Sequence, residues 1–143
     1  MAEIFWNPQV PELTVMDFAG SLDFYTRLLG FTVRYARTGP DFAYLDCGGA
    51  QLMIEARHSG DWEVAPLEAP FGRGVNFTIE MPDVDACFLR VQAAGWPLFR
   101  PLRDNCYPVN EQEESVMREF LLQDPDGYLL RPSQRLGKRA RRN

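Results

Sequence analysis

The sequence predicts an α+β fold of two paired βαβββ modules whose strands form a curved mixed sheet, a cup with helices on one side. The first supporting observation is an internal repeat: the segment from Val10 to Asp17 has a counterpart from Asn76 to Asp83. The second is that apolar residues at helical spacing follow each aspartate. The third is that beyond each helix the apolar period changes from about 3.6 to 2, which is typical of strands.

Both predicted helices carry start and stop signals. Asp17 and Asp83 stand where an N-cap accepts the first free amide hydrogens, and Gly30 and Gly95 stand where a helix ends in a left-handed turn. Between these signals lie the apolar positions of each helix, which are Phe18, Leu22, Tyr25 and Leu28 or Leu29 in the first and Val84, Cys87, Phe88, Val91 and Ala94 in the second.

Three further strands follow each helix. We expect them at residues 32–36, 42–47 and 51–56 in the first half and at 97–101, 117–123 and 128–133 in the second. Neither half can bury a sheet face with one helix alone, so we expect the two sheets to join. The modules are assigned to residues 1–66 and 67–134, with a linker at 57–73 that carries Trp62 and an irregular stretch at 104–114 that carries Tyr107.

Charge divides the chain into an acidic body and a basic end. The sequence has 20 acidic and 15 basic residues, and five of the basic residues fall in the tail, 135–143. A net-negative body disfavours nucleic acid and favours cationic ligands. The tail is predicted to be disordered, although contact of its bases with RNA is left open. With three cysteines in no metal or disulfide pattern and no apolar run of membrane-spanning length, we expect a cytoplasmic protein without membrane partners.

Strand alternation sorts the side chains by face. In the first module, Glu12 and Glu55 lie opposite the apolar residues of their strands, and Phe42 and Tyr44 fall on the same polar face as these glutamates. The apolar set is expected under the helices. Alternation leaves open whether the polar face lines a cup or simply contacts solvent.

Several motifs, in order along the chain, resemble the vicinal oxygen chelate superfamily, which includes glyoxalase I, bleomycin-resistance proteins and extradiol dioxygenases. These motifs are Met16-Asp17 through Ser21, Phe24-Tyr25, Leu29-Gly30-Phe31 and Asp124-Pro125-Asp126-Gly127-Tyr128, and the resemblance extends from about residue 10 to residue 134. It implies paired βαβββ modules around a cleft, which is often completed in a homodimer.

The resemblance also identifies four cleft positions that hold a metal ion in the enzymes of that superfamily. Here they are Val10, Glu55, Asn76 and Arg131, of which only Glu55 is a competent ligand. We therefore expect no metal, no cofactor and no catalytic residue, and a pairing of Glu55 with Arg131 that neutralises a buried charge. His58, the single histidine, is interpreted as a surface residue rather than a replacement ligand.

Loss of the metal ligands with retention of the fold is similar to the bleomycin-resistance branch, whose members share the ending through Arg131 and the pair Tyr107-Pro108. The resemblance implies a homodimer that sequesters a small or medium cationic ligand, an antibiotic of the glycopeptide type, without transforming it. The expected ligand-binding residues are Glu12, Phe42, Tyr44, Glu55, Trp62, Asn76, Tyr107 and Arg131. Two alternatives stay open: a glyoxalase-type lyase or isomerase with an unusual metal shell that includes Glu55 and His58, and a metabolite-binding member without drug affinity.

Overall fold

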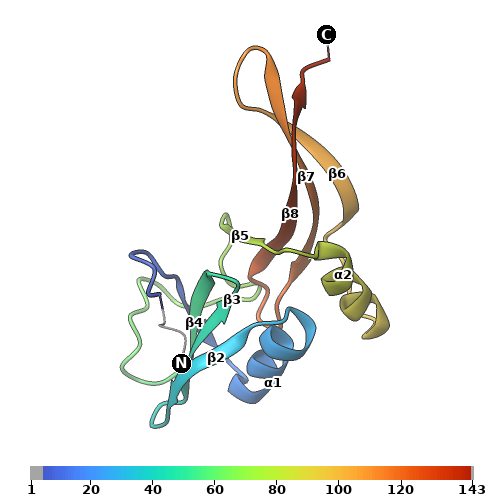
Figure 1. Ribbon diagram of the computed structural model, residues 1–143. Coiled ribbons are helices and arrows are strands. Elements are labelled where there is room, and N and C mark those ends of the chain that lie inside the picture. The colour runs from blue at the N-terminus through green and yellow to red at the C-terminus, as the bar shows by residue number, and fades with distance from the viewer. Residues whose placement is uncertain (1–4, 143) are drawn as a thin grey trace.

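The computed structural model describes residues 5–142 as two modules of like architecture (Figure 1). The first contains β1 (Glu12–Val15), α1 (Phe18–Asp23), the π-helical turn η1 (Phe24–Leu28), β2 (Thr32–Arg37), β3 (Phe42–Cys47) and β4 (Ala50–Ala56). The second contains β5 (Asn76–Glu80), α2 (Val84–Ala93), β6 (Arg100–Pro108), β7 (Glu113–Gln123) and β8 (Leu129–Ala140).

Each module forms its own four-stranded mixed sheet. The strand orders are β1-β4-β3-β2 and β5-β8-β7-β6. In both sheets the first strand runs parallel to the last, and the remaining pairs are antiparallel. This architecture confirms the α+β class of paired βαβββ modules. The expected joining of the sheets is not observed, because no strand pair between the described residues links one sheet to the other.

The predicted caps hold both helices. The Asp17 carboxylate accepts a hydrogen bond from the Gly20 N–H, and the Asp83 carboxylate accepts one from the Ala86 N–H, each at 3.1 Å. Gly95, just past α2, has a φ of 66°, which a residue with a side chain rarely adopts. None of the helices among residues 5–142 is long and apolar enough to cross a membrane.

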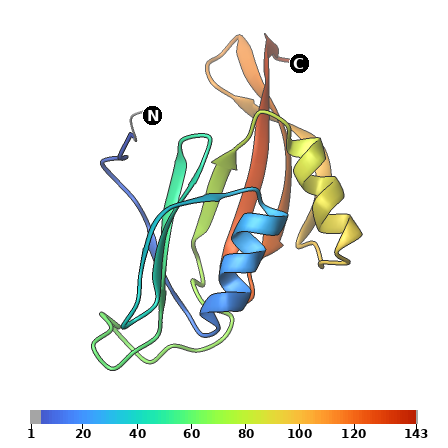
Figure 2. The ribbon, with the colours of Figure 1, turned by 60° about the horizontal axis from the view of Figure 1, so that its bottom comes forward.

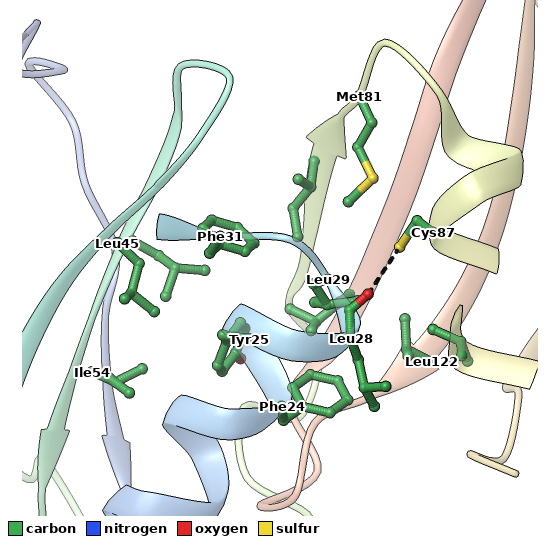
Figure 3. Packing of buried hydrophobic residues seen from close by; sticks show 14 of the residues in the cluster. Phe24, Tyr25, Leu28, Leu29, Phe31, Leu45, Ile54, Met81, Cys87 and Leu122 are labelled. Carbon is green, nitrogen blue, oxygen red and sulfur yellow. Dashed lines mark hydrogen bonds between the residues drawn. The ribbon is translucent and has the colours of Figure 1, made fainter. Parts of the chain in front are cut away.

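The two modules share one hydrophobic core in place of a common sheet. In Figure 2, α1 lies between the strands of the first module and β8 of the second. Figure 3 shows Tyr25 and Leu28 in the middle of this core, with Leu45 on the side of the first sheet and Leu122 on the side of the second. The Cys87 thiol lies 3.7 Å from the Leu28 carbonyl oxygen, which brings α2 onto η1. Burial of this shared core is what fixes one module against the other.

The basic tail is not disordered as predicted. Strand β8 continues to Ala140, which pairs with Glu113 of β7, so residues 135–140 are ordered sheet rather than a disordered end. Residues 104–108, expected to be irregular, belong to β6, and β7 begins at Glu113. Together these strands form an arm that projects from the body (Figure 1). Both faces of the arm carry many polar residues. The residues of the arm therefore lack the apolar alternation of a half-buried strand, and their pattern predicts irregular structure.

Candidate functional site

The polar face of the first sheet carries the candidate site. Glu12 of β1, Met53 of β4 and Tyr44 of β3 are neighbours across the sheet and therefore point to the same side. Leu13 and Ile54 point to the opposite side and are buried in the core. The strand alternation thus places the two faces as the sequence predicts.

A pocket of about 410 Å³ opens on this polar face. Its lining residues are Glu12, Thr14, Arg37, Glu55, His58, Gly60, Asp61 and Trp62. Three residues expected to bind ligand, Glu12, Glu55 and Trp62, are therefore brought together. Trp62 has an exposed fraction of 98%, so its indole stands free at the pocket. We call this cavity the acidic pocket, because it contains three carboxylates.

His58, expected at the surface, lines the acidic pocket with its side chain 32% exposed. Its Nε2 atom lies 2.7 Å from Glu55 Oε1 and 2.9 Å from Asp61 Oδ1. The His58 backbone N–H donates to Asp61 Oδ2 at 2.7 Å, and the Gly60 N–H donates to His58 Nδ1 at 3.1 Å. Because this turn follows directly on β4, it folds the histidine back over the last residues of the strand. Asp61 gave no signal in the sequence beyond being one acid in a polar linker.

The carboxylates of the acidic pocket perturb one another. The pKa of Glu12 is raised, first by burial and then by the nearby negative charge of Glu55 and Asp61, while Arg37 partly offsets the effect. Arg37 is itself engaged with the aromatic ring of Phe42, with its guanidinium carbon 4.0 Å from the ring centroid. The acidic pocket therefore holds more negative than positive charge.

Phe42 and Tyr44 share the face of the acidic pocket but do not line it. Phe42 has an exposed fraction of 1% and Tyr44 one of 5%. Arg37 covers Phe42, and Trp6 packs edge-on against Tyr44 with ring centroids 4.9 Å apart. The Tyr44 hydroxyl donates to the side-chain oxygen of Gln51. The sequence could not show that the segment before β1 crosses this face, and so Trp6 was missed.

The other expected residues gather in a second pocket, about 370 Å³, on the second module. It is lined by Asn76, Phe99, Arg100, Pro101, Arg103, Asn105, Tyr107, Glu119, Leu121 and Arg131. Asn76, Tyr107 and Arg131 thus lie on one module, and Glu12, Glu55 and Trp62 lie on the other.

The predicted Glu55–Arg131 pair is not formed within the described chain. Arg131 donates to the Thr78 hydroxyl at 3.0 and 2.6 Å, and its Nη1 lies 3.9 Å from Glu119 Oε2. Glu119 is buried and also accepts hydrogen bonds from the Tyr107 hydroxyl and, at 3.0 Å, from the Asn105 amide. Glu55 pairs with His58 instead. Glu55 and Arg131 therefore each contact partners from their own module.

Comparison with known proteins identifies the family. Residues 9–131 match the model of the Glyoxalase/Bleomycin resistance protein/Dioxygenase superfamily. The chain belongs to this superfamily. Among curated proteins, none matches the chain.

Several solved structures share the fold. TioX from Micromonospora sp. ML1 is 25% identical, with a TM-score of 0.65 over 90% of this chain and 95% of that chain. A glyoxalase/bleomycin resistance protein/dioxygenase from Alicyclobacillus acidocaldarius is also 25% identical, with a TM-score of 0.57 over 90% and 92%. A virulence protein from Salmonella typhimurium, 19% identical, has a TM-score of 0.60 over 92% and 98% and shares the fold alone.

The four positions at which metal enzymes of the superfamily place ligands do not fit a metal ion in this member. Val10 has no donor atom, and Arg131 places a permanent cation beside Thr78 and Glu119. Asn76 lines the second pocket, whereas Glu55 lines the acidic pocket. These four residues together therefore do not form a metal site.

Proposed function

We propose that this superfamily member is a ligand-binding protein of the bleomycin-resistance type, which sequesters a small or medium cationic organic molecule without transforming it. The observation that carries the proposal is the acidic pocket, in which Glu12, Glu55 and Asp61 converge beside Trp62. Its volume of about 410 Å³ falls within the usual range of small-molecule sites.

Charge and stacking supply the selectivity of this proposed site. Carboxylates in a partly enclosed pocket attract a cation more strongly than carboxylates in open water do. The exposed indole of Trp62 offers a flat face on which a heterocycle or a cationic group can stack. Arg37, held over Phe42, is one positive charge against the three carboxylates of the pocket and offsets them only in part.

The homodimer and the cytoplasmic location belong to the same proposal. A second copy would bring another second-module pocket, with Arg131, Tyr107 and Asn76, within reach of a bound ligand. An arrangement of this kind would unite the two groups of expected residues, which a single chain keeps on separate modules.

Calorimetric titration of the protein with metal-free bleomycin, in a buffer that contains EDTA, tests the proposal. We expect saturable binding of this cationic glycopeptide and none of the anionic dye 1-anilinonaphthalene-8-sulfonate. Glu12→Gln and Trp62→Ala should each weaken bleomycin binding about tenfold, because a charged hydrogen bond or a stacking contact contributes about 1–2 kcal/mol.

Glu111→Gln is the matched control, because it removes one negative charge from the exposed turn between β6 and β7. This variant should bind bleomycin as the parent does. Equal affinity for the anionic dye would contradict the proposal, and so would binding of bleomycin that neither pocket variant weakens. Light scattering with and without bleomycin tests the homodimer.

A further inference from the structure

Three side chains of types that can bind a metal ion converge in the acidic pocket. Glu55 comes from the end of β4, and His58 and Asp61 come from the turn that follows it. One ligand atom from each residue lies within 4.8 Å of the other two. The Asp61 side chain is only 6% exposed, so this carboxylate has little contact with water.

The hydrogen bonds of His58 leave negative charge uncompensated. The Gly60 N–H donates to Nδ1, so that atom carries no proton, and the proton of a neutral ring resides on Nε2, between the two carboxylates. Glu55 and Asp61 set two carboxylates against this one ring, and Glu12 adds a third carboxylate nearby. Carboxylates removed from water need a cation as partner.

We propose that Glu55, His58 and Asp61 bind one divalent transition-metal ion. This site shares only Glu55 with the four strand positions of the superfamily, because its other two ligands, His58 and Asp61, lie in the turn after β4. One imidazole with two carboxylates suits Zn²⁺, Ni²⁺ or Co²⁺, whereas Mg²⁺ and Ca²⁺ favour shells of oxygen and water. Remaining coordination positions would face the acidic pocket.

The geometry requires only a small adjustment to accept the ion. Bonds of about 2.0–2.1 Å in a tetrahedral site separate the ligand atoms by about 3.3 Å. The Nε2 atom of His58 now lies 2.7 and 2.9 Å from the two carboxylate oxygens, so the three side chains must spread by about half an ångström.

Metal binding has a consequence for the turn itself. The ion takes the place of the proton on His58 Nε2, and the ring stays neutral with its proton on Nδ1. The Gly60 N–H then loses its acceptor and must turn away. Since Trp62 follows Asp61 directly, the ion would also fix the position of the indole beside the acidic pocket.

Titration of the protein with metal ions, in the absence of any organic ligand, tests the site. The protein is the full chain without a histidine tag, and EDTA removes bound metals before the titration. We expect a 1:1 complex with Zn²⁺ and at least about 100-fold weaker binding of Mg²⁺. The chain has a single histidine, so a change at Nε2 in the ¹⁵N spectrum of its imidazole on Zn²⁺ addition reports on His58 alone. The amide signal of Gly60 should move with it.

Variants assign the ligands. His58→Gln and Asp61→Asn should each weaken Zn²⁺ binding at least about 100-fold. Loss of a residue that only hydrogen-bonds to a metal ligand already lowers metal affinity about 10–100-fold, and these variants remove a ligand itself. Glu63→Gln is the control, since Glu63 pairs with Arg57 at 2.8 Å and lies outside the three ligands. This control should change Zn²⁺ affinity less than about threefold. Circular dichroism verifies that each variant is folded.

A clear result overturns the proposal. Absence of 1:1 Zn²⁺ binding, an unchanged Nε2 signal at saturation, or a folded His58→Gln variant with parental affinity would each exclude the site. The titration contains no organic ligand, so its outcome is independent of the proposed sequestration. Glu12→Gln separates the two further, because it should weaken bleomycin binding but change Zn²⁺ affinity less than about threefold.

Discussion

Asp124 shows how a single side chain ties the two modules together. Its carboxylate accepts the Tyr25 hydroxyl of the first module at 2.7 Å and the backbone N–H groups of Asp126, Gly127 and Tyr128 at 2.9–3.0 Å. Burial raises the pKa of Asp124 to about 6, and these hydrogen bonds offset the rise only in part. The first aspartate of the Asp-Pro-Asp-Gly-Tyr motif is thus a structural residue in this chain.

This raised pKa predicts a pH-dependent stability. The folded chain binds the Asp124 proton more tightly than the unfolded chain does, whose aspartate pKa is about 3.9. The free energy of unfolding should therefore fall as pH rises from about 4 to about 6, by up to about 3 kcal/mol for a shift of two units. Urea unfolding at several pH values, followed by circular dichroism, measures this slope.

The Asp124→Asn variant should remove this part of the slope, because its amide does not titrate. Asp41→Asn, which alters an exposed carboxylate, should keep the parental slope. A parental slope in Asp124→Asn would assign the pH dependence to other groups.

At the scale of the element, the arm of β6, β7 and β8 is the main departure from the predicted structure. Its strands are joined by backbone pairing out to Ala140 and by ion pairs between neighbouring strands. Arg139 contacts Glu114 at 2.8 Å, and Arg118 contacts Asp104 at 2.7 Å. Solvent reaches the arginines of both pairs and weakens the attraction, so the backbone pairing is the larger stabilising contribution.

Removal of residues 136–143 tests whether the end of β8 pairs with β7. Glu113 through Val116 of β7 lose their β8 partners in the truncated chain. We expect amide hydrogen exchange there to accelerate at least about tenfold, because each lost hydrogen bond contributes about 0.5–1.5 kcal/mol. Exchange in the first sheet should stay unchanged and serves as the internal control. Unchanged protection at residues 113–116 would indicate a tail that is free in solution.

The cap of α2 gives a second prediction at this scale. Asp83→Ala removes the side-chain acceptor for the Ala86 N–H and should lower the free energy of unfolding by about 1 kcal/mol. Asp83→Asn retains an acceptor oxygen and should lower it by only a few tenths of a kcal/mol. Denaturant titration of the two variants measures the difference. Equal stabilities would show that the cap is not what stabilises this helix start.

At the scale of the whole molecule, one core makes the modules a single cooperative unit. Leu28 is 2% exposed, and its carbonyl oxygen accepts a hydrogen bond from Arg90 of α2 at 3.0 Å. The side chains around it come from both modules. Neither sheet therefore has a complete apolar covering of its own, and the two are expected to unfold together.

Leu28→Ala should destabilise both sheets by the same amount, about 2–5 kcal/mol, through the cavity it leaves. Amide hydrogen exchange at increasing denaturant concentration measures the free energy of unfolding separately for β3 of the first sheet and β7 of the second. Leu89→Ala, on an exposed position of α2, is the control and should change stability by less than about 0.5 kcal/mol. Loss of protection in the first sheet alone would contradict the single core.

The sequence alone predicted the features that depend on neighbours within a few residues. The aspartate caps, the stop at Gly95 and the alternation that puts Glu12 and Glu55 on one face are all local, and the structure has each of them. The family and the repeated modules follow from the order of such local signals.

Only the tertiary structure decided which charged groups meet. Arg131 lies beside the buried Glu119 and not beside Glu55, because the two sheets stay separate. Trp6 reaches Tyr44 through a chain segment that carries no periodic pattern. Ion pairing depends on distances of a few ångströms between elements, and composition and spacing along the chain do not encode those distances.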